Sequence, residues 1–303
     1  MDSIFAGMNG NYSVTIFSDG TKIRMTPSIE FIPEYPESID LKITNRCNMN
    51  CPYCHEQSTQ IGNHGDLNRV VDKLDVLPPG VEIAIGGGNP LEHPGLIIFL
   101  QWCKKKGFIT NLTVHANHVK DIPKQIFDDC LIYGLGISYN GEKENLTKKY
   151  FGVEYLNTVS HLIIGIHSLD DIRNALTLYG KVLLLGFKNQ GRARINKLNN
   201  RKHLLKIQQQ LWGIVIKNTG IISFDNLALT QLNIKKYLSP IEWQKFYMGD
   251  DGKFTMYYDA VLGLYGVSST QPKQNMIGDN SCGIIDFFQQ ISINKREETA
   301  NAY

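Results

Sequence analysis

Three cysteines lie within eight residues of the sequence, at Cys47, Cys51 and Cys54. Thiolates bind soft or borderline metals, including zinc, copper(I) and the irons of iron–sulfur clusters. In a reducing compartment, clustered cysteines more often hold a metal or take part in chemistry than form disulfides. A closed structural site needs four protein ligands, whereas three cysteines in one loop can hold three irons of a cubane cluster and leave the fourth open. The spacing therefore predicts a metal centre with one open position.

Two other interpretations of the cysteines stay open. A structural zinc site would use His55 as its fourth ligand, although adjacent Cys54 and His55 reach one tetrahedral ion only awkwardly and no second C-x2-C pair completes a zinc ribbon. A redox disulfide would use two cysteines and leave the third unexplained. The alternative function is therefore a non-catalytic zinc or iron–sulfur protein that acts as a partner module.

Length and composition limit the class of protein. The chain has 303 residues, enough for one large α/β barrel or two small domains, and its net charge of +2 indicates no bulk attraction to nucleic acid or membrane. The N-terminus carries Asp2 and lacks a basic head followed by a long apolar core, so it does not have the pattern of a signal peptide. No apolar run approaches the ~20 residues that span a bilayer. We expect a cytoplasmic protein without a membrane partner.

Strand-like and helix-like segments alternate from residue 38 onward. This rhythm is typical of parallel strands with crossover helices, and six to seven strand–helix units favour a partial or full (β/α) TIM-like barrel. The expected strands are 38–44, 81–87, 108–116, 130–139, 161–167, 181–187, 220–226 and, after the repeat ends, 253–261. The expected helices are 66–77, 93–106, 120–128, 142–157, 168–179 and 199–217.

We expect three regions along the chain. Residues 1–35 form an N-terminal β-hairpin appendage, because two alternating runs are joined by Ser18-Asp19-Gly20, a hairpin signal. Residues 36–226 form the barrel core. Residues 227–303 form a C-terminal extension that contains one cysteine, Cys282, so a full auxiliary cluster is not expected there.

In a parallel α/β barrel, chemistry takes place in the loops that follow the C-terminal ends of the strands. The cysteine loop follows the first predicted strand of the barrel, and "GGGNP" at 86–90 follows the second. The two loops are therefore expected to be neighbours on one face.

The motif Cys47-x3-Cys51-x2-Cys54, with aromatic Tyr53 before the last cysteine and a strand before the first, resembles the signature of the radical S-adenosylmethionine (radical SAM) superfamily. The resemblance covers residues 38 to about 226. It implies a 4Fe–4S cluster on the three cysteines, with S-adenosylmethionine on the fourth iron. It also implies reductive cleavage to a 5′-deoxyadenosyl radical that abstracts hydrogen from a substrate. An electron donor of the flavodoxin or ferredoxin type would be a partner.

The resemblance extends to second-rank contacts with S-adenosylmethionine. Gly86 and Gly87 would let the backbone approach the methionine amino group, and Asn89 stands near the place of the family's usual Glu. Tyr53 would lie near the adenine, and Lys188 or Arg192 would pair with the methionine carboxylate. The remaining cofactor-binding candidates are Asn117 and Ser138. The other interpretation of Asn117, Ser138, Lys188 and Arg192 is a loop residue that faces solvent, and that of the glycine run is an ordinary turn.

Two classes of substrate stay open, an anionic nucleotide or nucleic acid and a peptide or protein. The span 172–224 contains no Asp or Glu but ten Lys and Arg, which indicates either a solvated helix face or a patch for an anionic nucleotide or nucleic acid. The residue pattern of the C-terminal extension loosely resembles that of peptide- and protein-modifying members of the superfamily. Asp225 and Asp259, near the ends of late strands, are candidates to face the substrate.

Overall fold

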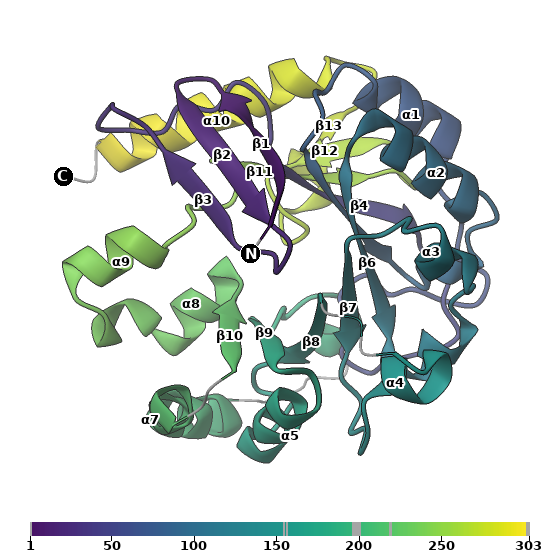
Figure 1. The fold of residues 1–303 in the computed structure, drawn as a ribbon, viewed down its shortest axis with the longest axis vertical. Helices are drawn as coiled ribbons and strands as arrows, with labels where there is room; N and C mark the ends of the chain where they lie inside the picture. Colours follow the sequence, from purple (N-terminus) through teal and green to yellow (C-terminus); the bar gives the residue numbers. More distant parts are fainter. Residues whose placement is uncertain (1, 154, 156, 196–200, 218–219, 301–303) are drawn as a thin grey trace.

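The structure is a computed structural model that describes residues 2–153, 155, 157–195, 201–217 and 220–300. Its centre is a ten-stranded sheet in the order β10-β9-β8-β7-β6-β5-β4-β11-β12-β13, which curls around a lumen with helices on its outer face (Figure 1). Strands β4 to β11 run parallel in this sheet. No described strand pairs with the outer edge of β10, so the barrel is partial. The predicted TIM-like α/β fold is confirmed in its partial form.

The strands of the large sheet are β4 (Ser38–Thr44), β5 (Glu82–Gly87), β6 (Ile109–His115), β7 (Gly134–Ser138), β8 (Thr158–Ile163), β9 (Lys181–Leu185), β10 (Ile221–Phe224), β11 (Thr255–Asp259), β12 (Leu264–Gly266) and β13 (Ile277–Gly278). The helices are α1 (Leu67–Leu74), α2 (Leu96–Lys106), α3 (Gln125–Asp128), α4 (Leu146–Phe151), α5 (Leu169–Tyr179), α6 (Gly191–Ile195), α7 (Arg201–Lys217), α8 (Asn226–Leu232), α9 (Pro240–Phe246) and α10 (Ile284–Ala300). Short 3-10 turns are η1 (Pro90–Glu92), η2 (Ala116–Asp121), η3 (Ile234–Tyr237) and η4 (Lys273–Asn275).

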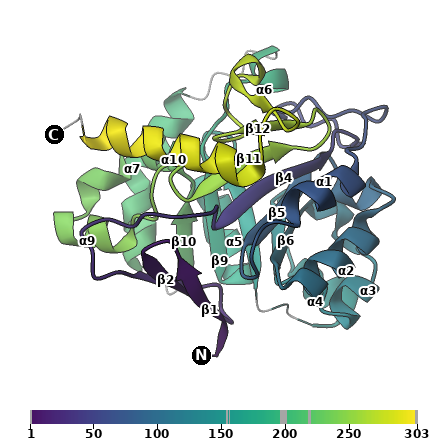
Figure 2. The same cartoon turned by 90° about the horizontal axis from the view of Figure 1, so that it is seen from above.

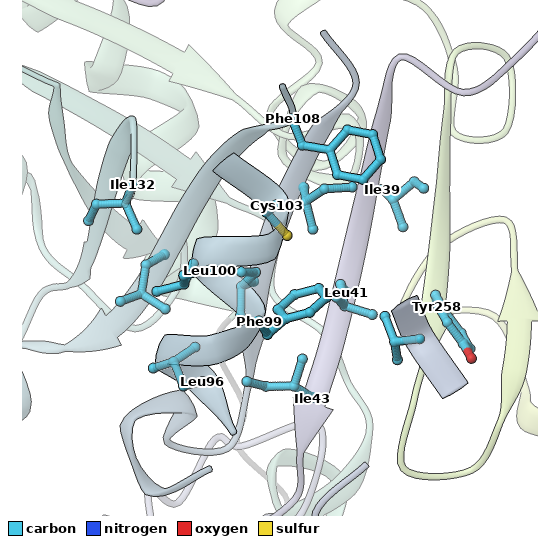
Figure 3. Packing of buried hydrophobic residues seen from close by; sticks show 14 of the residues in the cluster. Ile39, Leu41, Ile43, Leu96, Phe99, Leu100, Cys103, Phe108, Ile132 and Tyr258 are labelled. Atoms are coloured by element: carbon cyan, nitrogen blue, oxygen red, sulfur yellow. The ribbon is translucent and has the colours of Figure 1, made fainter. Parts of the chain in front are cut away.

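Alternation along β4 decides which side chains reach the lumen. Ile39, Leu41 and Ile43 are buried against the helices, where they meet Phe99 and Leu100 of α2 (Figure 3). Side chains of a strand alternate between its two faces, so Asp40 and Lys42 point to the other side, into the lumen. The apolar face anchors the strand and the polar face is left for function.

Local signals explain where the helices begin and end. Helix α5 begins at a capping box in which Ser168 accepts from the Asp171 amide and Asp171 accepts from the Ser168 amide. It ends at Gly180, whose φ of 70° gives the left-handed C-cap. Helix α1 begins at Asp66, which accepts from the amides of Asn68 and Arg69.

A three-stranded antiparallel sheet, β1 (Ser3–Asn9), β2 (Tyr12–Phe17) and β3 (Lys22–Met25), lies at one end of the barrel, opposite α6 (Figure 2). It contacts residues at the starts of barrel strands: Lys22 pairs with Glu82 at 3.1 Å, and the Lys181 ammonium donates to the Asp19 carbonyl at 2.8 Å. Lys22, Arg24 and Tyr12 also converge on the buried carboxylate of Glu37. The small sheet thus covers the N-terminal end of the barrel.

The C-terminal strands β11 to β13 extend the large sheet. Strand β11 pairs parallel with β4 from Thr255↔Ser38 to Asp259↔Lys42, and β12 and β13 follow antiparallel. Helix α10 packs Ile284, Phe287 and Phe288 into the same core as β4. Among the described residues, no helix combines the length and apolarity that crossing a membrane requires.

Candidate functional site

The cysteine loop, residues 45–65, joins β4 to α1 and is held by its own backbone. The Cys47 amide donates to the Thr59 carbonyl at 2.9 Å, and the Thr59 amide donates to the Asn45 carbonyl at 3.1 Å. The Asn45 amide donates to the Asn63 carbonyl at 2.8 Å, and the Cys54 amide donates to the Cys51 carbonyl at 3.2 Å. The loop is therefore folded back on itself at the C-terminal end of the first barrel strand.

Cys47, Cys51 and Cys54 are partly buried and line one cavity. Burial raises the pKa of the Cys51 thiol, and the neighbouring Cys54 and Cys47 raise it further, while Arg192 opposes them. Burial and Cys54 also raise the pKa of Cys47. All three side chains border the same cavity, so the loop presents them to one space. No group of three His, Cys, Asp or Glu side chains in the described ranges is arranged to hold a single metal ion.

The glycine loop after β5 packs directly on the cysteine loop. The Gly88 amide donates to the Thr44 carbonyl at 2.8 Å, and the Asn89 amide donates to the Arg46 carbonyl at 2.7 Å. A Cβ at Gly87, whose φ is 117°, would lie 2.4 Å from the Thr44 oxygen, and one at Gly88 would lie 2.2 Å from the Arg46 oxygen. Only glycine permits this approach. The expectation that the two loops are neighbours is confirmed.

Gly86 differs from the two glycines that follow it. A Cβ at this position would meet nothing within 4 Å, and Gly86 lines the cavity. Its missing side chain therefore leaves open space beside the cysteine loop, and a ligand can approach the backbone there.

Arg192, at the start of α6, holds the cysteine loop by hydrogen bonds from the far side of the barrel. Its Nε donates to the Cys51 carbonyl and one terminal nitrogen to the Ser58 carbonyl, both at 2.8 Å, and its amide donates to the Cys54 carbonyl at 3.0 Å. The preceding Gly191 has a φ of 53°, and a Cβ there would lie 2.4 Å from the His55 oxygen. The segment after β9 thus fixes three backbone carbonyls of the cysteine loop.

The cavity has a volume of about 340 Å³ and extends from the cysteine loop into the lumen of the barrel. Small-molecule sites have volumes of ~300–1,000 Å³. Its lumen-facing lining from the strands is Asp40, Lys42, Ala84, Gly86, Thr113, His115, Ser138, His161, Ile163 and Leu185. Six consecutive strands, β4 to β9, therefore contribute to one site.

Tyr53 and His167 face each other across part of the cavity. Their ring centroids are 6.5 Å apart in an edge-on arrangement. His167 accepts from the Ile163 amide at Nδ1 (2.8 Å), so Nε2, 3.2 Å from the Tyr139 carbonyl, carries the proton. Burial lowers the pKa of His167, and burial and the nearby Cys51 raise that of Tyr53 to about 12. Both groups are thus neutral near pH 7.

A charged network lies beside the cysteine loop. The Lys42 ammonium is 2.5 Å from Glu56 and 3.3 Å from Asp259, which also pairs with Lys273 at 2.7 Å. The Tyr257 hydroxyl donates to Glu56 at 3.2 Å. Burial alone would raise the pKa of Glu56. The charge of Lys42 outweighs this effect and lowers the pKa of Glu56 to about 2. These paired charges tie the cysteine loop to β4, β11 and η4.

Most of the contacts expected from the sequence border this cavity. The residues that line it are Cys47, Cys51, Cys54, Tyr53, Gly86, Gly87, Ser138, Lys188 and Arg192. Lys188 donates to the Ser269 hydroxyl at 2.8 Å and lies 3.4 Å from His55 Nε2. Burial and the charge of Lys188 lower the pKa of His55 to about 3.

Two expected contacts lie outside the cavity lining. Asn89 caps η1, where its side chain accepts from the Leu91 amide and donates to Glu92. Asn117 lies in η2, where its amide oxygen accepts from Asn140 at 3.2 Å and its nitrogen is 3.9 Å from the Met49 sulfur.

The remaining sequence candidates have structural partners. Asp225 caps α8 and accepts from the Gly186 amide at 2.9 Å, Asp259 is fully buried among lysines, and Cys282 packs against the core. Of the basic residues of 172–224, Lys181 lies at the N-terminal end of the barrel, whereas Lys188 and Arg192 lie at the other. Lys197 is outside the described residues.

Sequence reasoning missed Asp40, His161 and Tyr257 as cavity residues. Asp40 sits on a strand whose other face is aliphatic, and His161 alternates with the buried Ser160 and Leu162. A polar residue that alternates with buried ones in a parallel strand marks a lumen position. Tyr257 gave no such signal, because its place depends on the distant pairing of β11 with β4.

Comparison with known proteins agrees with this geometry. Residues 41–182 match the Radical SAM superfamily. GTP 3′,8-cyclase of Petrotoga mobilis is 30% identical over 105 residues, which cover 32% of each chain. 7,8-Dihydro-6-hydroxymethylpterin dimethyltransferase of Methanocaldococcus jannaschii is 28% identical over 27% of this chain and 17% of its own length. The chain thus matches a third or less of these two relatives.

Among solved structures, Streptococcus suis SuiB bound to the precursor peptide SuiA resembles this chain with a TM-score of 0.58 and 12% identity. The match covers 85% of this chain and 65% of SuiB. At this identity the likeness shows a shared fold.

Proposed function

Because the chain belongs to the radical SAM superfamily through residues 41–182, we propose that it is a radical SAM enzyme whose Cys47, Cys51 and Cys54 hold a 4Fe–4S cluster. The observation that carries the proposal is the shared cavity. The three cysteines, the open space at Gly86 and the polar face of the barrel strands all border it. A cofactor held at the cysteine loop would therefore be next to whatever the lumen binds.

The residues present fit both cofactors of the superfamily. Three partly buried sulfurs on one loop suit a cluster that keeps one iron open. The glycine-lined space beside them suits the amino-acid end of S-adenosylmethionine. When bound, the two cofactors supply a 5′-deoxyadenosyl radical that takes a hydrogen atom from the substrate.

The chain's own residues hold and shield this centre. Arg192 fixes the carbonyls of Cys51 and Ser58, and its positive charge favours the thiolate forms of Cys47 and Cys51. Lys188 and Ser138, on the same cavity, are proposed to contact the methionine carboxylate and the ribose. Tyr53, held opposite His167, is proposed to lie along the adenine. The small N-terminal sheet covers the far end of the barrel and limits water there.

The division of the chain follows the same proposal. Residues 36–226 would be the catalytic core, residues 1–35 the appendage at its N-terminal end, and residues 227–303 an extension that supplies Tyr257 and Ser269 to the cavity. A flavodoxin- or ferredoxin-type protein would deliver the electron, since cleavage of the sulfonium needs a low-potential reductant.

The proposed substrate is a peptide or protein side chain, or a nucleotide, that reaches the lumen. The names of the similar proteins cover both classes, a GTP cyclase on one side and a peptide-bound enzyme on the other. The location of the basic residues of 172–224 favours the first class. Lys181 and the pair Lys188 and Arg192 lie at opposite ends of the barrel, so these three do not form one anionic-ligand surface.

The test begins with anaerobic reconstitution of the purified protein. We expect about four irons and four sulfides per chain, and 5′-deoxyadenosine after addition of dithionite and S-adenosylmethionine. Cys47→Ala should lose both the cluster and the product, whereas Cys130→Ala, at an exposed cysteine outside the motif, should keep them. A colourless protein with stoichiometric zinc would support the partner-module alternative instead.

A further inference from the structure

Strand β7 leaves a bare place on the lumen wall of the barrel. Ser138 lines the cavity, and side chains of a strand alternate between its two faces, so Gly136 lies on the lumen side as well. A Cβ at Gly136 would lie 2.6 Å from Cε1 of His161, on β8, and 2.7 Å from the hydroxyl oxygen of Thr113, on β6. The missing side chain therefore gives room to a ring and a hydroxyl from the two flanking strands.

His161 and Thr113 present polar atoms that the protein itself leaves without a partner. Both side chains are half-buried and line the cavity. Among the described residues, no hydrogen bond or ion pair engages the His161 ring or the Thr113 hydroxyl. The described side-chain atoms that are both unpartnered and fully enclosed are His118 Nε2, Ser160 Oγ and the Tyr265 hydroxyl. The polar atoms of His161 and Thr113 are therefore open to the cavity.

This part of the lumen wall, β6 to β8, carries no charge. Burial lowers the pKa of His161 to about 4, and no charged side chain of the described residues adds to this effect, so the ring is neutral near pH 7. The charged residues that line the cavity lie on β4, on the cysteine loop and after β9, and they are Asp40, Lys42, Glu56, Lys188 and Arg192. A charged group placed against β6 to β8 would lose its water without meeting a counter-charge, which costs free energy.

The bare place is separate from the space proposed for S-adenosylmethionine. Thr113 and Gly136 are register partners, and His115 and Ser138 pair two residues further along the same strands. Two residues of a strand span ~7 Å, so Thr113 and Gly136 lie deeper in the lumen than Ser138, the proposed ribose contact. His161 is in register with Ser138, and its ring leans back toward Gly136. A ligand over Gly136 would therefore lie below the cofactor.

We propose that His161 and Thr113 recognise an uncharged hydrogen-bonding group of the substrate, an amide or a hydroxyl, over the bare backbone of Gly136. The inference deepens the proposed function and rests on it for the identity of the ligand as a substrate. A neutral imidazole offers one donor and one acceptor, and a hydroxyl can act as either. The pair can thus match an amide or a hydroxyl but offers no counter-charge to an ion. Such a group comes either from a side chain of a peptide or from the sugar of a nucleoside.

The test measures binding by calorimetry to the reconstituted protein with S-adenosylmethionine and no reductant. The peptide probes are the Nα-acetyl amides of asparagine and threonine, their near-isosteres with leucine and valine, and the charged analogue with aspartate. The sugar probes are uridine and 2′,3′-dideoxyuridine.

We expect at least one polar probe to bind about fivefold or more tightly than its apolar counterpart, the effect of one or two hydrogen bonds. The aspartate probe should bind more weakly than the asparagine probe. Preference within the peptide set indicates a peptide side chain, and preference within the uridine pair indicates a sugar. No preference in either set, no binding of any probe, or tighter binding of the aspartate probe would overturn the inference.

Variants separate recognition from structure. His161→Gln keeps a neutral donor and acceptor and should retain part of the preference, whereas His161→Leu should abolish it. Gly136→Ala keeps His161 and Thr113 but places a methyl group where they meet, so it should abolish the preference as well. His203→Gln, on α7 and outside the cavity lining, is the control and should retain all of it.

Two further readouts make the outcome decisive. The melting temperature of His161→Leu should stay close to that of the wild type, because the ring has no hydrogen bond to lose among the described residues. Persistence of the preference in His161→Leu would contradict the recognition role. If 5′-deoxyadenosine forms without any preference among the probes, only this inference fails; if the preference is present but no 5′-deoxyadenosine forms, only the proposed function fails.

Discussion

The Nε of Arg192 donates a hydrogen bond to the carbonyl oxygen of Cys51 at 2.8 Å, although 141 positions separate the two residues in the sequence. The same guanidinium reaches Ser58, and the Arg192 amide reaches Cys54. The shape of the cysteine loop therefore depends on the segment that follows β9, on the other side of the barrel. One side chain links the proposed metal centre to that distant part of the fold.

Arg192→Lys tests this link. Lysine keeps the charge but cannot make the forked contact with two carbonyls, and charge-assisted hydrogen bonds of this kind contribute ~1.5–3 kcal/mol each. We expect the free energy of unfolding to fall by about 2 kcal/mol and iron incorporation to fall with it. Arg173→Lys, at an exposed arginine paired with Asp170, is the matched control and should change neither. Equal iron content in both variants would show that Arg192 does not position the loop.

Gly191 provides a second probe of the same contact. Gly191→Ala has to place a methyl group 2.4 Å from the His55 oxygen at a φ of 53°. Gly152→Ala meets the same kind of backbone penalty at a φ of 73°, but nothing lies within 4 Å of its Cβ. Chemical denaturation should show a loss of about 1 kcal/mol for Gly152→Ala and a clearly larger loss for Gly191→Ala. Equal losses would mean that the loop moves away without cost.

Glu37 attaches the small N-terminal sheet to the barrel. Burial alone would raise its pKa, but the hydrogen bond from Arg24 and the charges of Lys22 and Arg24 lower it. Because the folded pKa is depressed, the stabilisation is present above the unfolded pKa and is lost as pH falls through the folded value. Glu37→Gln should cost about 3 kcal/mol near pH 7, since it leaves two enclosed cations unpaired. Glu144→Gln, in an exposed pair with Lys149, should cost under about 0.5 kcal/mol.

Asp40 should give the opposite pH dependence. Its pKa is raised from 3.8 to about 6, so the folded protein holds this proton more tightly than the unfolded chain does, and stability falls as pH rises between those values. The charged groups that face it are Lys188, Asp225, Asp251 and Glu82. The difference in unfolding free energy between Asp40→Asn and the wild type should therefore grow in favour of the variant from about pH 4 to pH 6 and then level off. A difference that is constant across this range would show that Asp40 has an ordinary pKa.

The barrel and its metal loop were predictable because their signals are local. The strand expected at 38–44 is β4 residue for residue, and the helix expected at 168–179 differs from α5 by one residue, since a capping serine and a C-terminal glycine mark its ends. The cysteine spacing identified the loop without any tertiary information.

The parts of the fold and of the site that the sequence did not predict depend on contacts between distant segments. A strand was expected at 253–261, but its parallel pairing with β4 joins residues more than 200 positions apart, and no local pattern encodes it. Tyr257 and Asp259 reach the site through that pairing alone. Helix α10 was not predicted, although Ile284, Phe287, Phe288 and Ile291 have the i, i+3, i+4, i+7 spacing of an apolar helix face. The absence of Asn89 and Asn117 from the cavity lining likewise follows from capping and η2 contacts that the family resemblance does not encode.

Gly86 allows the cofactor pocket to be tested apart from the fold. A methyl group at this position would enter open space, so Gly86→Ala should fold with an unchanged melting temperature. The same methyl group would occupy volume proposed for S-adenosylmethionine, and overpacking of a fitted site costs ~1–3 kcal/mol, or about tenfold in affinity. Calorimetric titration of the reconstituted protein with S-adenosylmethionine measures this loss.

Gly213→Ala is the control for Gly86→Ala, because it also adds a methyl group where nothing lies within 4 Å, but in the middle of helix α7. It should leave the affinity for S-adenosylmethionine unchanged and raise stability by up to ~1 kcal/mol, since alanine is the better helix former. If Gly86→Ala binds S-adenosylmethionine as tightly as Gly213→Ala does, the amino-acid end of the cofactor does not approach the backbone at Gly86. The glycine run would then serve only to pack β5 against the cysteine loop, as the close approaches at Gly87 and Gly88 require.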